Sequence, residues 1–255
     1  GPGQLPPLMI PSGTLSGNFN IVPNPNGAGE GVPVSIWAKD TAVVGGGGTG
    51  NWKTCDHDQF RHGGAVCQDT KGDGETGANW LSCACNNERS NSTNINEDIV
   101  LYPEDDFPSS PFFYVFGDTP ENVKNVAATE GLVLPNCNTL AGGFAGLSGS
   151  ALVWVEGDCL IDGIEIGSRN KPIVLIVEGE IRVNANSEVW GILFGLGNFV
   201  LNGGPVIHGS AVSENPSDLT NGNYSQVYDP DVFANLKDPE VNTILSRLQY
   251  SWRDF

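Results

Sequence analysis

The sequence is poor in basic residues. It has 12 Lys and Arg against 30 Asp and Glu in 255 residues, a formal net charge of −18. Binding to nucleic acid or to an anionic membrane depends on Lys and Arg side chains that meet phosphates. We therefore expect no nucleic-acid partner and no attachment to an anionic lipid surface. Charged residues make up only 16% of the chain, too few for the composition typical of disordered proteins.

Helix-forming residues are scarce as well. The chain has one Met, and its 34 Gly and 17 Pro together make a fifth of all residues. Gly and Pro favour tight turns and interrupt helices. At this length the chain can bury a sizeable core. The composition therefore predicts a turn-rich, mainly β protein.

Long hydrophobic runs are missing. The most apolar stretch, 189–201, includes three glycines and falls short of the about 20 apolar residues that span a bilayer. The opening GPGQLPPLMIPSG also lacks the basic and apolar parts of a signal peptide. Because Gly1-Pro2-Gly3 is typical of tag removal, we interpret residues 1–11 as a scar and linker, and expect any targeting segment to have been lost.

Six cysteines are present, without a C-x-x-C pair. A zinc site that also uses His57 and His62 is one interpretation. We favour disulfides, which indicate an exported protein. The expected pairing joins Cys137 to Cys159, and the other four pair among themselves within 55–85: Cys55, Cys67, Cys83 and Cys85.

The second half of the chain contains an internal repeat. Segment 152–161 aligns with 174–183 at an offset of 22, and 174–183 aligns with 192–201 at an offset of 18. Each copy has glycine, a polar residue, then two apolar residues separated by a variable one, and 17–21 repeats the pattern. The alternation places the apolar side chains on one face, which a single turn of chain cannot bury alone. We expect equivalent strands to stack in parallel.

The predicted fold is a mainly β parallel β-solenoid (β-helix) with a disulfide-stapled loop excursion and a few short helices. The alternative, an antiparallel sandwich, requires hairpins at regular spacing. Short helices are expected at 119–128, with Thr119 as N-cap and Pro120 at the first position, and from Asp229 onward. The expected parts are first coils at 12–44, a cysteine-rich and loop/helix excursion at 45–148, further coils at 149–214 and a capping segment at 215–255.

Catalytic motifs are not evident. No G-x-S-x-G or P-loop occurs, and there are three histidines, of which His208 aligns with Trp190 and is expected to pack. A β-helix lyase or hydrolase would need carboxylates on neighbouring coils. Asp158 and Glu180, with Arg182 and Asn198 beside them, are the best such set, and we interpret them as solvent-facing surface residues.

Calcium is the more plausible ligand, and no motif requires a cofactor. Asp69, Asp73 and Glu75 lie in a loop partly similar to an EF-hand loop, to which Asp56 and Asp58 could contribute.

Two further segments are interpreted as surface or loop. The acidic stretch 91–106 is expected to lie mostly at the surface. The aromatic residues of the cysteine-rich part either meet a partner or glycan or pack under the loop: Trp52, Phe60 and Trp80.

Six short segments, in their order along the chain, carry a resemblance. They are 12–19 (SGTLSGNF), 31–37 (GVPVSIW), 80–85 (WLSCAC), 112–117 (FFYVFG), 152–157 (LVWVEG) and 251–255 (SWRDF). Together they resemble the PilX-type minor pilins (PilX-like pilus assembly proteins) of bacterial type IV pili, over most of the chain.

The resemblance implies a non-enzymatic pilus subunit that acts in assembly, priming and surface interaction. Its partners would be other minor pilins, the major pilin and a PilY-family tip adhesin, through surfaces that the sequence does not identify. It would be extracellular, in the fibre or at its tip, and before assembly in the inner membrane facing the periplasm. The N-terminal apolar helix that anchors such pilins would be missing from this chain. The alternatives are a β-helix polysaccharide lyase or hydrolase and a calcium-dependent surface adhesin.

Overall fold

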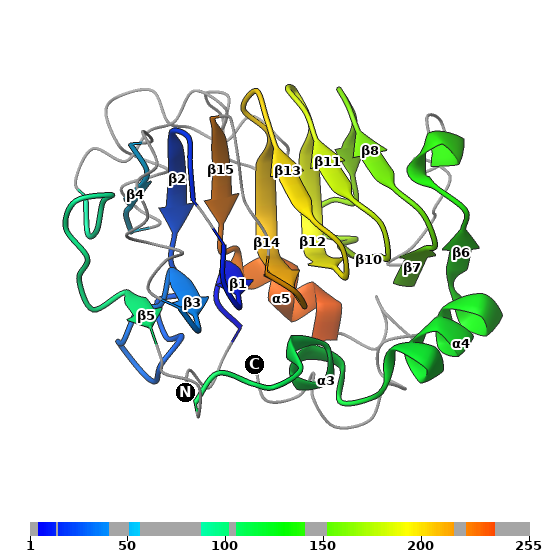
Figure 1. The fold of residues 1–255 in the computed structure, drawn as a ribbon, viewed down its shortest axis with the longest axis horizontal. Coiled ribbons are helices and arrows are strands. Elements are labelled where there is room, and N and C mark those ends of the chain that lie inside the picture. The colour runs from blue at the N-terminus through cyan, green and yellow to red at the C-terminus, as the bar shows by residue number, and fades with distance from the viewer. Residues whose placement is uncertain are drawn as a thin grey trace.

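The structure is mainly β with a few short helices. It is a computed structural model that describes residues 5–13, 15–40, 51–56, 88–101, 106–140, 152–216 and 223–237. Within them the strands form a 12-stranded sheet and a three-stranded sheet (Figure 1). Every pairing between these strands is parallel, which argues against the antiparallel sandwich.

The large sheet contains β1 (Leu8–Ile10), β2 (Phe19–Val22), β3 (Ile36–Ala38), β4 (Lys53–Thr54), β5 (Ile99–Leu101), β6 (Leu132–Leu134), β7 (Leu152–Val155), β9 (Glu165–Ile166), β10 (Ile173–Val177), β12 (Glu188–Gly195), β14 (Val206–Ser213) and β15 (Tyr224–Val227). The small sheet contains β8 (Cys159–Ile161), β11 (Ile181–Val183) and β13 (Phe199–Leu201). The helices are α3 (Pro111–Phe116), α4 (Pro120–Glu130), α5 (Pro230–Lys237) and the short 3-10 helix η2 (Cys137–Leu140).

The register of the strands matches the sequence repeat. In the large sheet Val174 pairs with Leu152 on one side and with Ile192 on the other. In the small sheet Ile181 pairs with Cys159 and with Phe199. The three repeat copies are therefore parallel neighbours with equivalent residues side by side, as predicted.

The order of strands in the large sheet differs from their order in the chain. The chain starts in the middle of the sheet at β1 and builds β2 to β5 toward one end. It then passes through α3 and α4 and re-enters at the opposite end with β6 (Figure 1). From β6 it stacks back through β7, β10, β12 and β14 to the starting point.

Segments from opposite ends of the described chain occupy the same level of the large sheet, where a level means one position in the succession of paired strands. The first part of β14 pairs with β15, and its second part pairs with β1. Residues 8–10 are therefore more than part of a scar and linker, because they form β1 and are buried. Residues 224–227 are likewise more than part of a cap, because they form β15, which lies inside the sheet between β14 and β2.

The excursion expected at 45–148 is more regular than predicted. It supplies β4 and β5 at one end of the large sheet and β6 at the other. These strands are two or three residues long, too short to give a visible periodicity.

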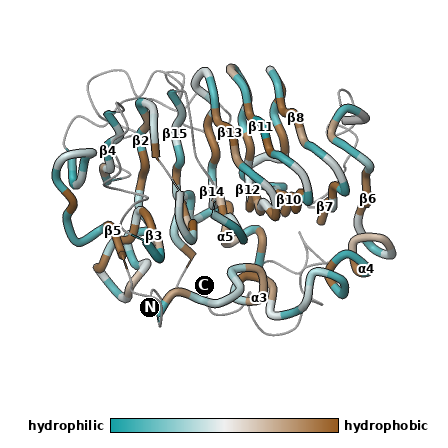
Figure 2. The backbone as a smooth tube through the Cα atoms, in the orientation of Figure 1, coloured by the Kyte–Doolittle hydropathy of each residue, from teal (hydrophilic) through white to brown (hydrophobic). Residues whose placement is uncertain are grey.

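The central strands of the large sheet, β7, β10, β12 and β14, are buried on both faces. On the inner face, Val153 and Leu175 belong to the same core cluster as Ile181 of the small sheet. The outer face of the large sheet packs against α3, α4 and α5 through Trp154, Ile176 and Phe194, among others. Figure 2 shows hydrophobic segments along β7, β10 and β12, between these two layers. The apolar runs LVWV and IVLIV fit this arrangement, because parallel strands covered on both faces have little need of polar positions.

The two predicted helices are present. Thr119 caps α4, its side chain accepting a hydrogen bond from the Asn122 amide, and α5 begins at Pro230. The sequence did not predict α3, which is capped by Ser110 and closed by Gly117 at φ 67°. The Glu214 carboxylate, which follows β14, accepts hydrogen bonds from Ser110 Oγ and the Phe112 amide, and thereby holds α3 on the sheet.

Among the residues that the structure describes, no helix combines the length and the hydrophobicity needed to cross a membrane.

Candidate functional site

One disulfide joins the first residue of β8 to the first residue of η2. Cys137 and Cys159 are bonded, the pair favoured from the sequence, with both side chains buried. Cys55 is also disulfide-bonded. Cys67, Cys83 and Cys85 lie outside the described residues.

Replacing Cys137 and Cys159 together by Ala should lower the free energy of unfolding by about 3 kcal/mol, because the bridge closes a loop with a sequence separation of 22. Denaturant unfolding followed by circular dichroism would measure the change. Reductant opens the bridge in the parent protein, so parent and variant should then unfold at the same midpoint. Equal midpoints without reductant would show that the bridge contributes nothing.

The predicted calcium ligands Asp69, Asp73 and Glu75 lie outside the described residues, as does Asp58. In the part of the chain that is described, no group of three or more His, Cys, Asp or Glu is placed to hold a metal ion. Calcium binding by the 69–75 loop stays a prediction.

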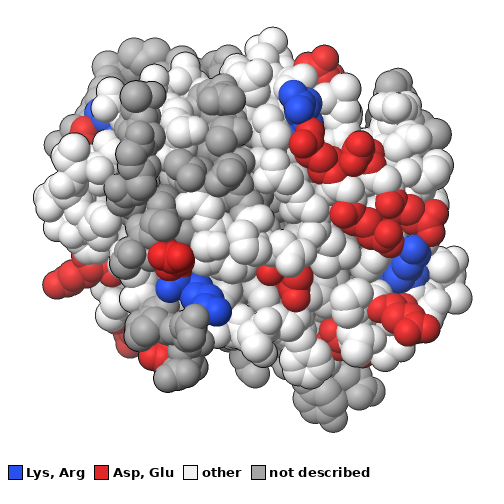
Figure 3. Space-filling model, viewed as in Figure 1, with Lys and Arg blue, Asp and Glu red and all other residues white. Residues whose placement is uncertain are grey.

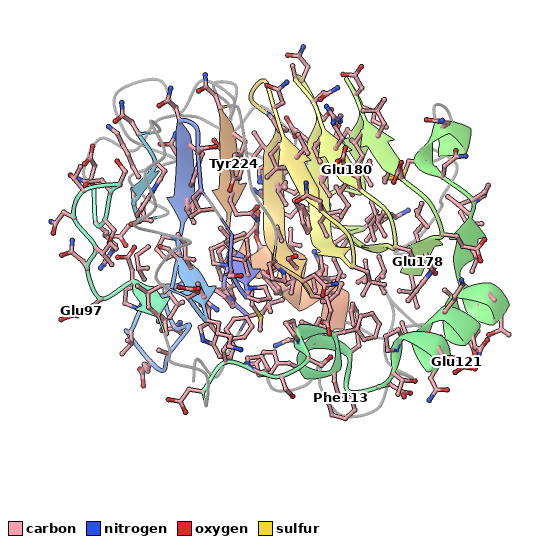
Figure 4. The ribbon with its side chains drawn as sticks, in the orientation of Figure 1. Glu97, Phe113, Glu121, Glu178, Glu180 and Tyr224 are labelled. Carbon is pink, nitrogen blue, oxygen red and sulfur yellow. A yellow bond between two sulfur atoms is a disulfide. The ribbon has the colours of Figure 1, made fainter. Side chains whose placement is uncertain are left out.

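The carboxylates Asp158 and Glu180 lie on neighbouring turns between the two sheets, and both make contacts that support the stack. Asp158 Oδ1 accepts a hydrogen bond from the Glu180 amide at 2.8 Å. The Glu180 side chain forms an exposed ion pair with Arg182 at 2.9 Å. Figure 4 shows Glu180 beside β11, and Figure 3 shows acidic side chains gathered over this part of the molecule. These contacts are those expected of structural surface residues.

A second carboxylate network fastens α4 to the sheet. Glu178 Oε1 accepts hydrogen bonds from Lys124 Nζ at 2.8 Å and from Trp154 Nε1 at 2.7 Å. Lys124 also pairs with Glu156 at 2.8 Å. The hydrogen bond from Lys124 lowers the pKa of the Glu178 carboxyl below its ordinary value of 4.5.

This shift predicts a pH-dependent attachment of α4. A carboxyl whose pKa is lower in the folded state stabilises the fold above its unfolded pKa and loses that effect as the pH falls through the folded pKa. Lys124→Met should therefore lower the melting temperature at pH 7 and lower it progressively less as the pH falls below 4.5. Because both side chains are about a third exposed, the effect at pH 7 should stay below about 1 kcal/mol.

Thermal unfolding between pH 2.5 and 7 would measure this difference, with Lys124→Arg, which keeps the positive charge, as the control that should show little change in melting temperature. A Lys124→Met effect of constant size over this range would contradict the assignment.

His208 packs, as its alignment with Trp190 predicts. The two rings are stacked with centroids 3.6 Å apart, and His208 is fully buried. The Arg169 guanidinium lies over the Trp190 ring, 5.4 Å from its centroid. Arg169 also forms an ion pair at 2.9 Å with Asp229, the residue just before α5. This cluster holds α5 against the sheet.

The buried carboxylate of Asp98 lies beside the residues that flank the cysteine-rich segment 55–85. Asp98 accepts hydrogen bonds from the hydroxyls of Ser35, Thr54 and Ser90. Backbone hydrogen bonds also join Thr54 to Ser90 at 2.8 Å and to Arg89 at 2.7 Å. The two ends of the segment are thus held together. Asp98 and Ile99 are buried, so the expectation that 91–106 lies mostly at the surface is wrong for these two residues.

A hollow of about 400 Å³ lies at the starts of β15, β2 and β4. Its lining is rich in amides and includes one lysine: Asn18, Asn20, Asn51, Asn223, Lys53 and Ser225. Asn223, Asn18 and Asn51 occupy the same position on three successive levels, because Tyr224 pairs with Phe19 and Asn20 pairs with Lys53. All three side chains are exposed.

Aromatic rings lie directly behind this row. Each of the three asparagines is followed by an aromatic residue, namely Tyr224, Phe19 and Trp52. These rings stack inside the molecule, with centroids 4.8 Å apart for Tyr224 and Phe19 and 6.3 Å apart for Phe19 and Trp52. Figure 4 shows Tyr224 on β15. Trp52 is therefore buried packing rather than an exposed contact, whereas Phe60 and Trp80 lie outside the described residues.

The sequence did not single out this row of asparagines. The repeated Asn-aromatic dipeptide was the available signal, since strand alternation sends the aromatic side chain inward and the preceding side chain outward.

Comparison with protein-family models, with curated proteins and with solved structures gives no match to this chain.

Proposed function

We propose that this chain is the extracellular head of a type IV pilus minor pilin, built on a parallel β-solenoid and acting without catalysis in pilus assembly and surface interaction. One observation carries the proposal. Three of the segments that resemble PilX-type pilins meet around α3, although they are far apart in the sequence. Tyr114 of FFYVFG contacts Trp37 of GVPVSIW at 5.2 Å between centroids, and Phe112 contacts Trp154 of LVWVEG at 6.1 Å.

This meeting supports the resemblance for a physical reason. Isolated matches of five to eight residues arise easily by chance, but matches that pack on one another describe a single structural unit. The unit joins α3 to both the early strand β3 and the later strand β7. A relative with the same segments in the same order could build the same core.

The β-solenoid is the simplest account of the strand register. Offsets of 18 and 22 residues return the chain to the same place in the large sheet, and each return also adds a strand to the small sheet. Each such turn covers the apolar face of the preceding one.

The disulfides support display outside the cytoplasm, where such bonds form and persist. The proposed partners are other minor pilins, the major pilin and a PilY-family tip adhesin. The proposed location is the fibre or its tip, after an inner-membrane stage before assembly.

Localisation in the source cells tests this proposal. Antibodies raised against the chain should label filaments sheared from the cell surface, and deletion of the gene should reduce the number of filaments. A cytoplasmic enzyme blotted in the same fractions controls for lysis. Recovery of the chain only with that enzyme would overturn the proposal.

A separate assay tests the absence of catalysis. The purified chain should leave neutral and acidic polysaccharides uncut. Cleavage by the parent chain that is lost in both Asp158→Ala and Glu180→Ala would contradict a purely structural role for these carboxylates.

A further inference from the structure

The row of asparagines at the starts of β15, β2 and β4 has the chemistry of a sugar-binding surface. Each amide offers two N–H donors and a carbonyl acceptor, and can therefore bind neighbouring hydroxyls that both donate and accept. Asn18, Asn51 and Asn223 repeat this group at the spacing of adjacent strands, about 4.8 Å. Ser225 adds a hydroxyl to the same hollow.

The base of the hollow is formed by buried aromatic residues, which hold the polar side chains in place. Phe19 and Tyr224 line it together with the polar side chains. Both are buried and stacked on each other, and Trp52 extends the stack. Burial also raises the pKa of the Tyr224 phenol, which stays neutral in the physiological range.

The hollow is held in shape by the sheet. Asn18 Oδ1 accepts a hydrogen bond from the Asn51 amide at 3.0 Å, which links two levels of the row. The strands that follow the asparagines are paired in register and their aromatic side chains are fixed in the core. A pre-formed site of this kind loses little conformational entropy when a ligand binds.

The charge of the site favours an uncharged ligand. Among the described residues of the lining, Lys53 is the one cationic side chain, and its ammonium pairs with Glu88 at 2.7 Å. The chain as a whole carries a formal charge of −18 and repels polyanions. An acidic glycan, a phosphorylated sugar or a nucleic acid would therefore bind poorly here.

We propose that this hollow binds a neutral oligosaccharide, with the exposed asparagine row holding the sugar hydroxyls and the buried rings of Phe19 and Tyr224 fixing the position of that row. The binding itself does not depend on pilus assembly. Only its biological meaning, contact with a glycan outside the cell, rests on the proposed function.

The test uses the whole chain and two variants, Asn18→Asp and Asn223→Asp. Both keep the size of the side chain and its oxygen acceptor, so the hydrogen bond from the Asn51 amide to residue 18 can persist. Both replace the NH₂ donor by a charge that cannot donate. Asn138→Asp, an exposed change in η2 at the opposite end of the sheet, is the matched control. Thermal unfolding first checks that all four proteins fold alike.

The chains are applied to an array of neutral oligosaccharides, including hexose and N-acetylhexosamine chains, and of sialylated and uronic acid glycans. The best binder is then titrated by calorimetry. We expect a neutral oligosaccharide to bind the parent and the control with equal affinity. Each variant should bind it at least tenfold more weakly, because it loses a hydrogen-bond donor to the sugar.

Three results would overturn the proposal. The parent could bind no neutral oligosaccharide, it could bind acidic glycans alone, or the two variants could bind as tightly as the control. The filament-labelling experiment reads out independently, so failure of the pilus assignment and failure of the glycan site are distinguishable.

Discussion

Gly191→Ala should lower the free energy of unfolding by more than about 3 kcal/mol. Gly191 lies within β12 at φ +137°, where L side chains are strained, and an added Cβ would overlap the backbone carbonyl oxygen of Ile173 on the neighbouring strand β10. Neither atom can move without breaking the parallel pairing. Because a domain is stable by only about 5–15 kcal/mol, the variant should be largely unfolded at moderate temperature. Denaturant unfolding of the purified variant would measure the loss.

Gly29→Ala is the matched control. Gly29 has a similar φ of +122° but lies in a turn with no atom within 4 Å of an added Cβ. Ala there should cost about 1–2 kcal/mol, from backbone strain alone. Equal losses at the two positions would show that the packing of β12 on β10 is not what requires glycine. Gly209, the neighbour of Gly191 on β14, should behave like Gly191, because its Cβ would overlap the Gly191 carbonyl oxygen.

Trp154→Ala should lower the free energy of unfolding by about 3–5 kcal/mol. Trp154 is buried where β7 meets the helix layer, with its ring against Phe112 of α3. Its indole N–H binds Glu178, and the Lys124 ammonium lies 5.8 Å from its ring centroid. Loss of the side chain leaves a cavity under two helices and removes one of the hydrogen-bond donors to the Glu178 carboxylate. Chemical denaturation monitored by far-UV circular dichroism would give the value.

Trp154→Phe separates the packing from the hydrogen bond. It keeps an aromatic ring against Phe112 but cannot donate to Glu178, so we expect a smaller loss of about 1–2 kcal/mol. A Phe variant as unstable as the Ala variant would show that the hydrogen bond, and not the filled volume, determines the effect.

The repeat made much of the stack predictable. Glycine followed by alternating apolar positions at 157–161, 179–183 and 197–201 defines both the turn and the inward face, and the observed register joins Cys159, Ile181 and Phe199. The helix at α4 was predictable for a local reason, since Thr119 and Pro120 fix its first turn.

Other strands, β1 above all, were not predictable because their partners are distant in sequence. β1 is three residues long and pairs with Ala211 and Val212, some two hundred positions away. No repeat copy marks it, and the prolines around it are typical of a linker. The helix α3 carried a start signal at Ser110-Pro111, but its run of aromatic residues is compatible with a strand as well.

The candidate site shows the same limit. Asn18, Asn51 and Asn223 are separated by long stretches of chain, and only the parallel pairing of β15, β2 and β4 brings them into one row. The calcium ligands predicted at Asp69, Asp73 and Glu75 lie instead within one short segment, and such a motif needs no long-range pairing. A local motif can be recognised in sequence, whereas a surface shared by three levels requires the register.

The path of the chain through the large sheet has a consequence for how the protein could be rearranged. Because β1 and β15 share a level in mid-sheet, the order of strands along the sheet is a rotated version of their order in the chain. A circular permutant that begins at Asp118, between α3 and α4, would lay down β6 through β15 and then β1 through β5 in strict spatial succession. Such a chain could fold from one end as it emerges from the ribosome. The natural order must leave its first strands without half of their neighbours until β14 and β15 are synthesised.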